Sequence, residues 1–85
     1  MTWEIIWGHP ALRDMRRLDR EILSRVHEAV ARFAETGQGN VAKLQGSDNE
    51  WRLQVGDWRV RFVYDYQSTT IRALRVLPRG RAYRD

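Results

Sequence analysis

The stretch from residue 51 to residue 65, WRLQVGDWRVRFVYD, decides the fold of this chain. Apolar residues alternate with polar ones on both sides of Gly56-Asp57. Alternation with a period of two is typical of a β-strand with one buried face, and a Gly-Asp pair between two such runs is typical of a tight turn. We therefore expect an antiparallel hairpin with strands at 51–55 and 58–65.

Two further segments that can form strands flank this hairpin. Residues 41–44 can form a strand before the turn at Gly46-Ser47-Asp48-Asn49, and residues 70–77 can form another after the turn at Gln67-Ser68-Thr69. The first of these turns consists of residue types that favour chain reversal. The second half of the chain thus predicts four antiparallel strands. Apolar residues fall on both sides of the last strand, so the pattern does not orient it.

The first half of the chain has a different organisation. Residues 2–7 alternate and predict a strand, which Gly8-His9-Pro10 ends. The apolar residues of 11–18 recur at helical spacing after that proline. Asp19 can cap a second helix, whose apolar stripe ends before Thr36-Gly37. We expect the two helices to form a hairpin.

These elements predict an α+β fold in one domain, residues 1–85, with an N-terminal strand, a helical hairpin and a four-stranded antiparallel sheet packed on the helices. A chain of 85 residues is too short for a deep cavity that would hold a large cofactor, so we expect none. The absence of cysteine excludes disulfides and thiolate chemistry. Because no segment is typical of a signal peptide or a membrane span, we expect a cytoplasmic protein with no membrane partner.

The net charge of +4 arises entirely in the second half of the chain. Residues 43–85 hold nine basic side chains and five acidic ones, whereas residues 1–42 hold six of each. Fourteen of the fifteen basic residues are arginine, whose planar guanidinium suits bidentate phosphate contacts. A polyanionic partner explains this excess, and codon bias or a requirement for solubility is the alternative.

The alternation in the central hairpin also places its arginines. If the apolar residues face the helices, four polar side chains must project from the opposite, open face of the sheet: Arg52, Gln54, Arg59 and Arg61. Like charges on neighbouring strands repel each other, so this crowding reduces stability. A surface that follows the phosphates of a nucleic acid explains the crowding, and a solvated sheet face is the alternative.

Four segments carry a resemblance to a known family. They are Ala11–Leu18, similar to the motif A-x-x-D-L-x-x-L; Lys43–Gly46, similar to K-L-x-G; Trp51–Val60, similar to Y-R-L-R-V-G-D-Y-R-V; and Arg75–Tyr83, similar to R-V-x-H-R-x-x-x-Y. Through these segments the chain resembles, over nearly its whole length, the RelE/ParE superfamily of toxins from type II toxin–antitoxin systems. The resemblance implies the RelE-like microbial RNase fold.

The resemblance also implies a function. RelE-like toxins are ribosome-dependent mRNA endonucleases that use the 2′-hydroxyl of the RNA as nucleophile and need no cofactor, whereas ParE-like toxins inhibit DNA gyrase. The chain is thus expected to inhibit translation, with the ribosome, mRNA and a cognate antitoxin as partners and operator DNA bound only through the antitoxin complex. A gyrase inhibitor without nuclease chemistry and a non-toxic relative that binds nucleic acid or antitoxin are the alternatives.

Matched onto the family motifs, the catalytic roles fall to Arg52, Arg59, Arg79 and Tyr83. We expect further RNA contacts from Lys43, Gln54, Arg61 and Arg81. Two departures from the family pattern imply weaker cleavage or a different target. Gln54 replaces a basic residue, and Pro78 replaces a common histidine.

Cleavage through a 2′-hydroxyl requires a base, positive charge at the phosphorus and an acid for the departing 5′-oxygen. Arginine supplies the charge but not the base, because its pKa exceeds about 12. Tyr83 lies among three arginines in the sequence, which favour its phenolate form. It can act as the base, stack on a nucleobase or pack on the sheet.

The histidines and tryptophans offer weaker candidates. His9 lies at a helix start and His27 beside the apolar stripe of the second helix, so both are expected on the helical side, away from the arginines. Their spacing matches no metal site, and we expect no bound metal. Core packing or an antitoxin groove is expected for the four tryptophans: Trp3, Trp7, Trp51 and Trp58.

Overall fold

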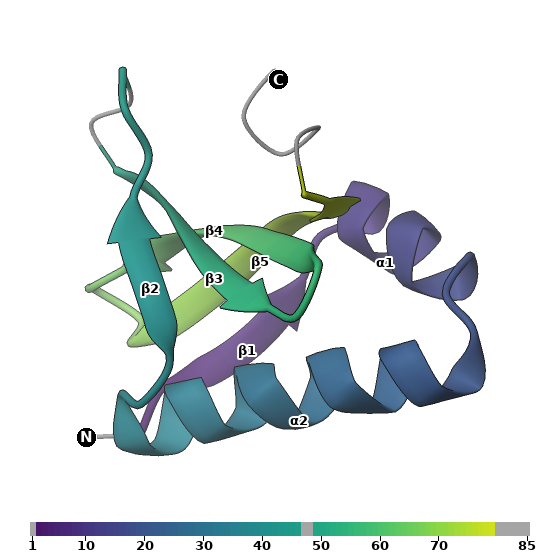
Figure 1. The fold of residues 1–85 in the computed structure, drawn as a ribbon. Coiled ribbons are helices and arrows are strands. Elements are labelled where there is room, and N and C mark those ends of the chain that lie inside the picture. The colour runs from purple at the N-terminus through teal and green to yellow at the C-terminus, as the bar shows by residue number, and fades with distance from the viewer. Residues whose placement is uncertain (1, 47–48, 80–85) are drawn as a thin grey trace.

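The computed structural model describes residues 2–46 and 49–79. Its elements are β1 (Glu4–Trp7), α1 (His9–Arg16), α2 (Arg20–Thr36), β2 (Asn40–Lys43), β3 (Glu50–Val55), β4 (Trp58–Asp65) and β5 (Thr70–Pro78). This order confirms the predicted α+β fold, in which a strand and two helices precede four strands. Figure 1 shows the strands gathered in one sheet, with α2 running along one side of it.

The sheet has five strands in the order β1-β5-β4-β3-β2. The pairs formed by β2, β3, β4 and β5 are antiparallel, as predicted. The N-terminal strand β1 joins the same sheet and runs parallel to β5. The two helices carry the chain across the sheet before β2 begins, so the first and last strands can become neighbours. The sheet is therefore mixed, which local sequence patterns did not predict.

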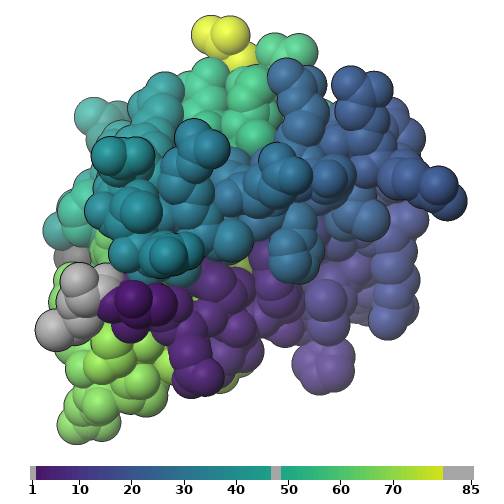
Figure 2. Space-filling view, turned by 90° about the horizontal axis from the view of Figure 1, so that it is seen from below, coloured from purple at the N-terminus to yellow at the C-terminus, as the bar shows by residue number. Residues whose placement is uncertain are grey.

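The two helices cover one face of the sheet and close the core. Asp19 caps α2, because its Oδ1 accepts a hydrogen bond from the backbone N–H of Ile22 at 2.9 Å. The core includes Val26, Val30 and Phe33 of α2, and Figure 2 shows α2 lying across this side of the molecule. The helix α1 packs chiefly on β5. Within the described residues, no helix is long and apolar enough to cross a membrane.

A β-bulge explains why the last strand could not be oriented from its sequence. Arg61 of β4 lies opposite Arg75, but the next residue, Phe62, lies opposite Ala73. One residue of β5, Leu74, is thus left over in the pairing. The extra residue reverses the alternation, so that Ala73 and Val76 both enter the core although three positions separate them.

Candidate functional site

Three arginines lie in a straight row across three neighbouring strands. Arg52 of β3 lies opposite Arg61 of β4, and Arg61 lies opposite Arg75 of β5. Directly opposed residues share a sheet face, and their Cβ atoms are about 4.5–5.5 Å apart. We call Arg52, Arg61 and Arg75 the arginine row. Two positions along the same strands, and on the same face, Gln54 of β3 lies opposite Arg59 of β4.

The register therefore brings together the four side chains predicted to share a face. It adds Arg75, which sequence reasoning had not selected as a site residue. Sequence reasoning missed Arg75 because the bulge at Leu74 shifts the alternation of β5 by one residue, so the face of Arg75 could not be predicted. In the sequence the bulge appeared only as apolar residues on both sides of β5, which did not show where the extra residue lies.

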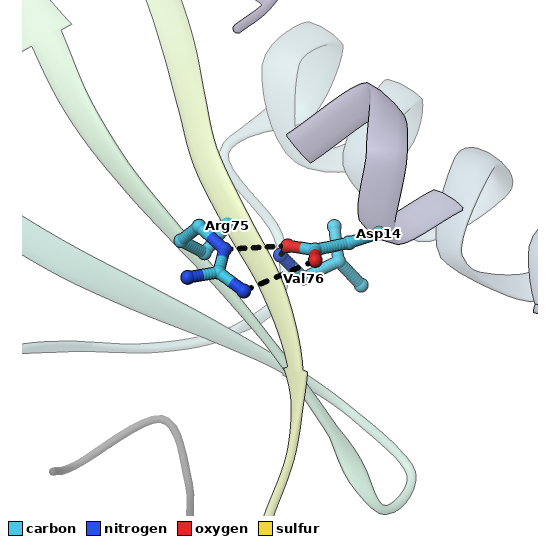
Figure 3. Close-up of polar contacts among 3 residues, drawn as sticks. All are labelled: Asp14, Arg75 and Val76. Carbon is cyan, nitrogen blue, oxygen red and sulfur yellow. Dashed lines mark hydrogen bonds and ion pairs between the residues drawn. The ribbon is translucent and has the colours of Figure 1, made fainter. Parts of the chain in front are cut away.

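Two carboxylates bind the middle and the last arginine of the row. On β3, Glu50 lies two residues before Arg52, and its Oε2 accepts a hydrogen bond from Nε of Arg61 at 3.1 Å and also contacts Nη2. From α1, Asp14 accepts hydrogen bonds from Nε and Nη2 of Arg75 at 2.8 and 3.1 Å (Figure 3). These ion pairs reduce the repulsion within the row. Among the described residues, the three arginines of the row thus have two carboxylates bound to them.

The same Asp14 carboxylate also binds the backbone of β5. Its Oδ2 accepts a hydrogen bond from the N–H of Val76 at 2.8 Å, beyond the point where β1 ends at Trp7. Burial raises the pKa of Asp14, but the hydrogen bonds from Arg75 and Val76 and the charges of Arg75 and Arg17 outweigh burial, so the pKa lies below its ordinary value. Asp14 thus joins α1 to the strand that leads to Arg79.

The prediction of an open face is wrong for Arg59. Only 3 % of this residue is exposed. Arg59 lies on β4, the central strand of the sheet, between Gln54 on one side and the buried Leu77 on the other. The alternation of the hairpin correctly predicted the sheet face on which Arg59 lies. Alternation does not show, however, whether neighbouring side chains cover a residue on that face. Arg61 is also largely enclosed, with 11 % of its side chain exposed.

Gln54 is held by hydrogen bonds to its neighbours. Its Oε1 accepts a hydrogen bond from Nδ2 of Asn40 at 3.3 Å, and its Nε2 donates to the carbonyl oxygen of Gly56 at 3.2 Å. The side chain therefore lies between Asn40 of β2 and the β3–β4 turn. A basic side chain could not accept the hydrogen bond from Asn40, because lysine and arginine carry no acceptor.

The end of β5 returns to this same turn. The backbone N–H of Arg79 donates a hydrogen bond to the carbonyl oxygen of Asp57 at 2.7 Å. Two residues earlier, Leu77 lies opposite Arg59. Arg79 is exposed, and its backbone lies close to the strand ends that hold Arg59 and Gln54. The two remaining candidates, Arg81 and Tyr83, lie outside the described residues.

Lys43 does not join the other candidates. It lies opposite Trp51, which packs against the core on the helical side of the sheet, whereas Arg52 points to the other side. Lys43 therefore lies on the opposite face of the sheet from Arg52, and its contact with RNA stays a prediction. The spacing of Lys43 within a short strand gave no indication of which face it occupies.

Both histidines lie on the helices, as predicted. The ring of His27 stacks on Trp7 with the centroids 5.9 Å apart, and His9 is the first residue of α1. All four tryptophans pack against the core. Within residues 2–46 and 49–79, no three metal-binding side chains gather where they could hold an ion. The described part of the site thus consists mainly of fixed positive charge, which suits an anionic ligand.

The fold is that of RelE toxins. A chain of the archaeal RelE–RelB complex from Pyrococcus horikoshii OT3 has a TM-score of 0.78 at 23% identity, over 95% of this chain and 99% of that one. The toxin–antitoxin complex RelBE2 of Mycobacterium tuberculosis gives 0.81 at 23%, over 94% of both chains. The isolated RelE toxin of E. coli gives 0.77 at 12%, over 93% and 86%. These structures define the class of fold.

The sequence identifies the family itself. The model described as "ParE toxin of type II toxin-antitoxin system, parDE" matches residues 5–83. The chain therefore belongs to the ParE toxin family, within the RelE/ParE superfamily of type II toxin–antitoxin systems, and the predicted resemblance is confirmed. No curated protein sequence matches the chain significantly.

Proposed function

We propose that this toxin is a ribosome-dependent mRNA endonuclease that stops translation by cutting transcripts through their own 2′-hydroxyl groups. The arginine row is the observation that carries this proposal. Arg52, Arg61 and Arg75 lie opposite one another on one sheet face, with Arg59 in the adjacent position. Such crowding of like charge reduces stability, and an RNA backbone would balance it.

The proposed reaction forms a bond between the 2′-oxygen and phosphorus and breaks the bond from phosphorus to the 5′-oxygen. The 2′-hydroxyl gives up a proton, and the departing 5′-oxygen takes one. Negative charge gathers on the phosphoryl oxygens in between, and preorganised positive charge lowers the barrier. We assign contact with these oxygens to Arg79, which is exposed, and to Arg52, which is half-buried.

Arg59 has a different role in this proposal. Because it is almost fully buried, its guanidinium supplies a fixed positive charge beneath the surface rather than a side chain that extends to the substrate. Charges in such surroundings are screened less than charges in water, so they act more strongly on a nearby anion. The proton acceptor in this proposal is Tyr83, and Arg81 contributes to RNA binding.

The partners follow from the same proposal. The similar toxins of Pyrococcus horikoshii and Mycobacterium tuberculosis come from toxin–antitoxin complexes. We propose a cognate antitoxin for this chain too, with operator DNA bound only through the complex of the two proteins. The substrate places the toxin in the cytoplasm, where ribosomes and mRNA are found.

Inhibition of DNA gyrase is the second candidate function. It is favoured by the family model, which describes ParE toxins and matches residues 5–83. Gln54 agrees with it, because an amide in place of a basic residue lowers the positive charge next to Arg59. A gyrase inhibitor would bind its target through this surface without chemistry.

Pulse labelling after induction in a bacterial host separates the two functions. A nuclease stops the incorporation of labelled amino acids first, while DNA synthesis continues. Replacement of the exposed Arg79 by alanine should restore protein synthesis, whereas Arg32→Ala on the exposed side of α2 should not. Arrest of DNA synthesis with continuing translation would refute the nuclease and favour the gyrase inhibitor. Unimpaired growth at full expression would contradict both.

A further inference from the structure

A hollow between α1 and β5 lies next to the arginine row. It has a volume of about 380 Å³ and is lined by Pro10, Arg13, Asp14, Arg17 and Arg75. A second hollow of about 160 Å³ shares Asp14, Arg17 and Arg75 with the first and extends to Pro78 at the end of β5. The two hollows therefore connect α1 with the strand end that precedes Arg79.

The periodicity of α1 explains this lining. Pro10, Arg13, Asp14 and Arg17 are spaced at i, i+3, i+4 and i+7, which places them on one face of a helix. Asp14 is already bound to Arg75 and to the N–H of Val76. The ion pairs found among the described residues are Arg75 with Asp14 and Arg61 with Glu50, so neither involves Arg13 or Arg17.

The hollow therefore has an excess of positive charge. Three guanidinium groups face one carboxylate, and that carboxylate stays ionised because its pKa lies below the ordinary value. Arg13 and Arg17 are both exposed. Exposed arginines that converge on a recess with a single, already bound acid provide donors for an anion with several oxygens.

We propose that this hollow is a second phosphate-binding site, which holds the backbone of a single-stranded RNA as it leaves the arginine row. Arg75 belongs to both places, because it lies opposite Arg61 in the row and also lines the hollow. A single RNA strand can therefore contact the arginine row first and then Arg13 and Arg17 of α1, because Arg75 joins the two surfaces. The inference rests on the proposed function, which identifies the ligand as RNA.

The salt dependence of RNA binding tests the site. The probe is a short single-stranded RNA with 2′-O-methyl groups, which binds but cannot be cut through its 2′-oxygens. For single strands, the slope of log K against log salt concentration changes by about 0.7 for each phosphate contact. The double variant Arg13→Ala/Arg17→Ala should therefore lower the magnitude of the slope by about 1.4.

The matched control is Arg16→Ala/Arg20→Ala, which removes the same charge from exposed arginines outside the hollow. This control should leave the slope within about 0.3 of the parent value, well below the change expected for two phosphate contacts. Equal slopes for the two double variants would overturn the inference, and so would a parent protein that does not bind the RNA at low salt. Both variants should stay folded, because Asp14 keeps its hydrogen bonds to Arg75 and Val76. The loss of the Arg17 charge beside Asp14 should lower the thermal unfolding temperature only slightly.

Failure of the site and failure of the nuclease give different results. If the parent cuts mRNA on ribosomes but the two double variants bind the probe equally, the phosphate site is wrong and the nuclease stands. If the parent cuts no mRNA but its binding depends on Arg13 and Arg17, the nuclease is wrong and the phosphate site stands.

Discussion

Arg61 lies directly opposite Arg75 across β4 and β5, and each of the two binds a carboxylate of its own. Glu50 binds Arg61 from β3, and Asp14 binds Arg75 from α1. The two acids allow the arginine row to exist in the absence of a ligand, yet they leave it with net positive charge. The balance between these acids and the arginines sets both the stability of the fold and its affinity for an anion.

Replacing Glu50 by glutamine should separate these two effects. The change removes one negative charge from the arginine row, so affinity for the 2′-O-methyl RNA should rise about two- to fivefold. The free energy of unfolding should fall by about 1–3 kcal/mol, because Arg61 loses a charged hydrogen-bond partner in a largely enclosed position. Filter binding and urea denaturation measure the two quantities. Glu28→Gln, an exposed change on α2, should alter neither.

The Asp14→Asn variant should lose stability without losing the fold. Its side chain is 10 % exposed and binds Arg75 and the N–H of Val76. Asparagine keeps one acceptor oxygen but no charge, so the free energy of unfolding should fall by about 1–3 kcal/mol in urea denaturation. A change below about 0.3 kcal/mol would show that α1 is not held to β5 through this contact.

The contribution of Asp14 should also depend on pH. Its pKa in the folded protein lies below the ordinary value of 3.8, so folding favours the ionised carboxylate. The stability that it provides is fully present above that ordinary value, and it is lost as the pH falls through the lower pKa of the folded state. The difference in stability between parent and Asp14→Asn should therefore be constant near neutral pH and shrink below about pH 4. A difference that grows as the pH falls would contradict this sign.

A basic residue at position 54 should strengthen RNA binding. Gln54→Lys adds a positive charge opposite Arg59, and it removes the acceptor that binds Asn40. We expect the magnitude of the salt slope to rise by about 0.7, one phosphate contact, with a loss of stability of about 1 kcal/mol from the lost hydrogen bonds. The control Gln45→Lys adds the same charge at an exposed position outside the row and should change the slope less. Equal slopes would show that position 54 does not contact RNA.

Most of the sheet could be predicted from the hairpin at 51–65, because its alternation sets the face of each side chain and its turn sets the register. The pairing of Arg52 with Arg61 follows from these two features. The pattern failed where one residue was added to a strand. Leu74 in the bulge reverses the alternation of β5, which hid Arg75.

Contacts between segments that are distant in the sequence were beyond local patterns. The parallel pairing of β1 with β5 and the contact between Asp14 and Arg75 both join residues more than sixty positions apart. The burial of Arg59 has the same origin, because it depends on its place in the central strand and on the residues of β3 and β5 beside it. Sequence reasoning therefore found the charge of the site but not the acids that balance it.

The most direct test of the nuclease is cleavage of an mRNA on purified ribosomes, with the new ends mapped by primer extension. The parent toxin should cut transcripts in the ribosomal A site, and Arg79→Ala should slow cleavage by about 100-fold or more. Arg79→Ala should keep the fold, because the hydrogen bond to Asp57 comes from the backbone. Cleavage by Arg79→Ala at the parent rate, or no cleavage by the parent toxin, would contradict the proposal.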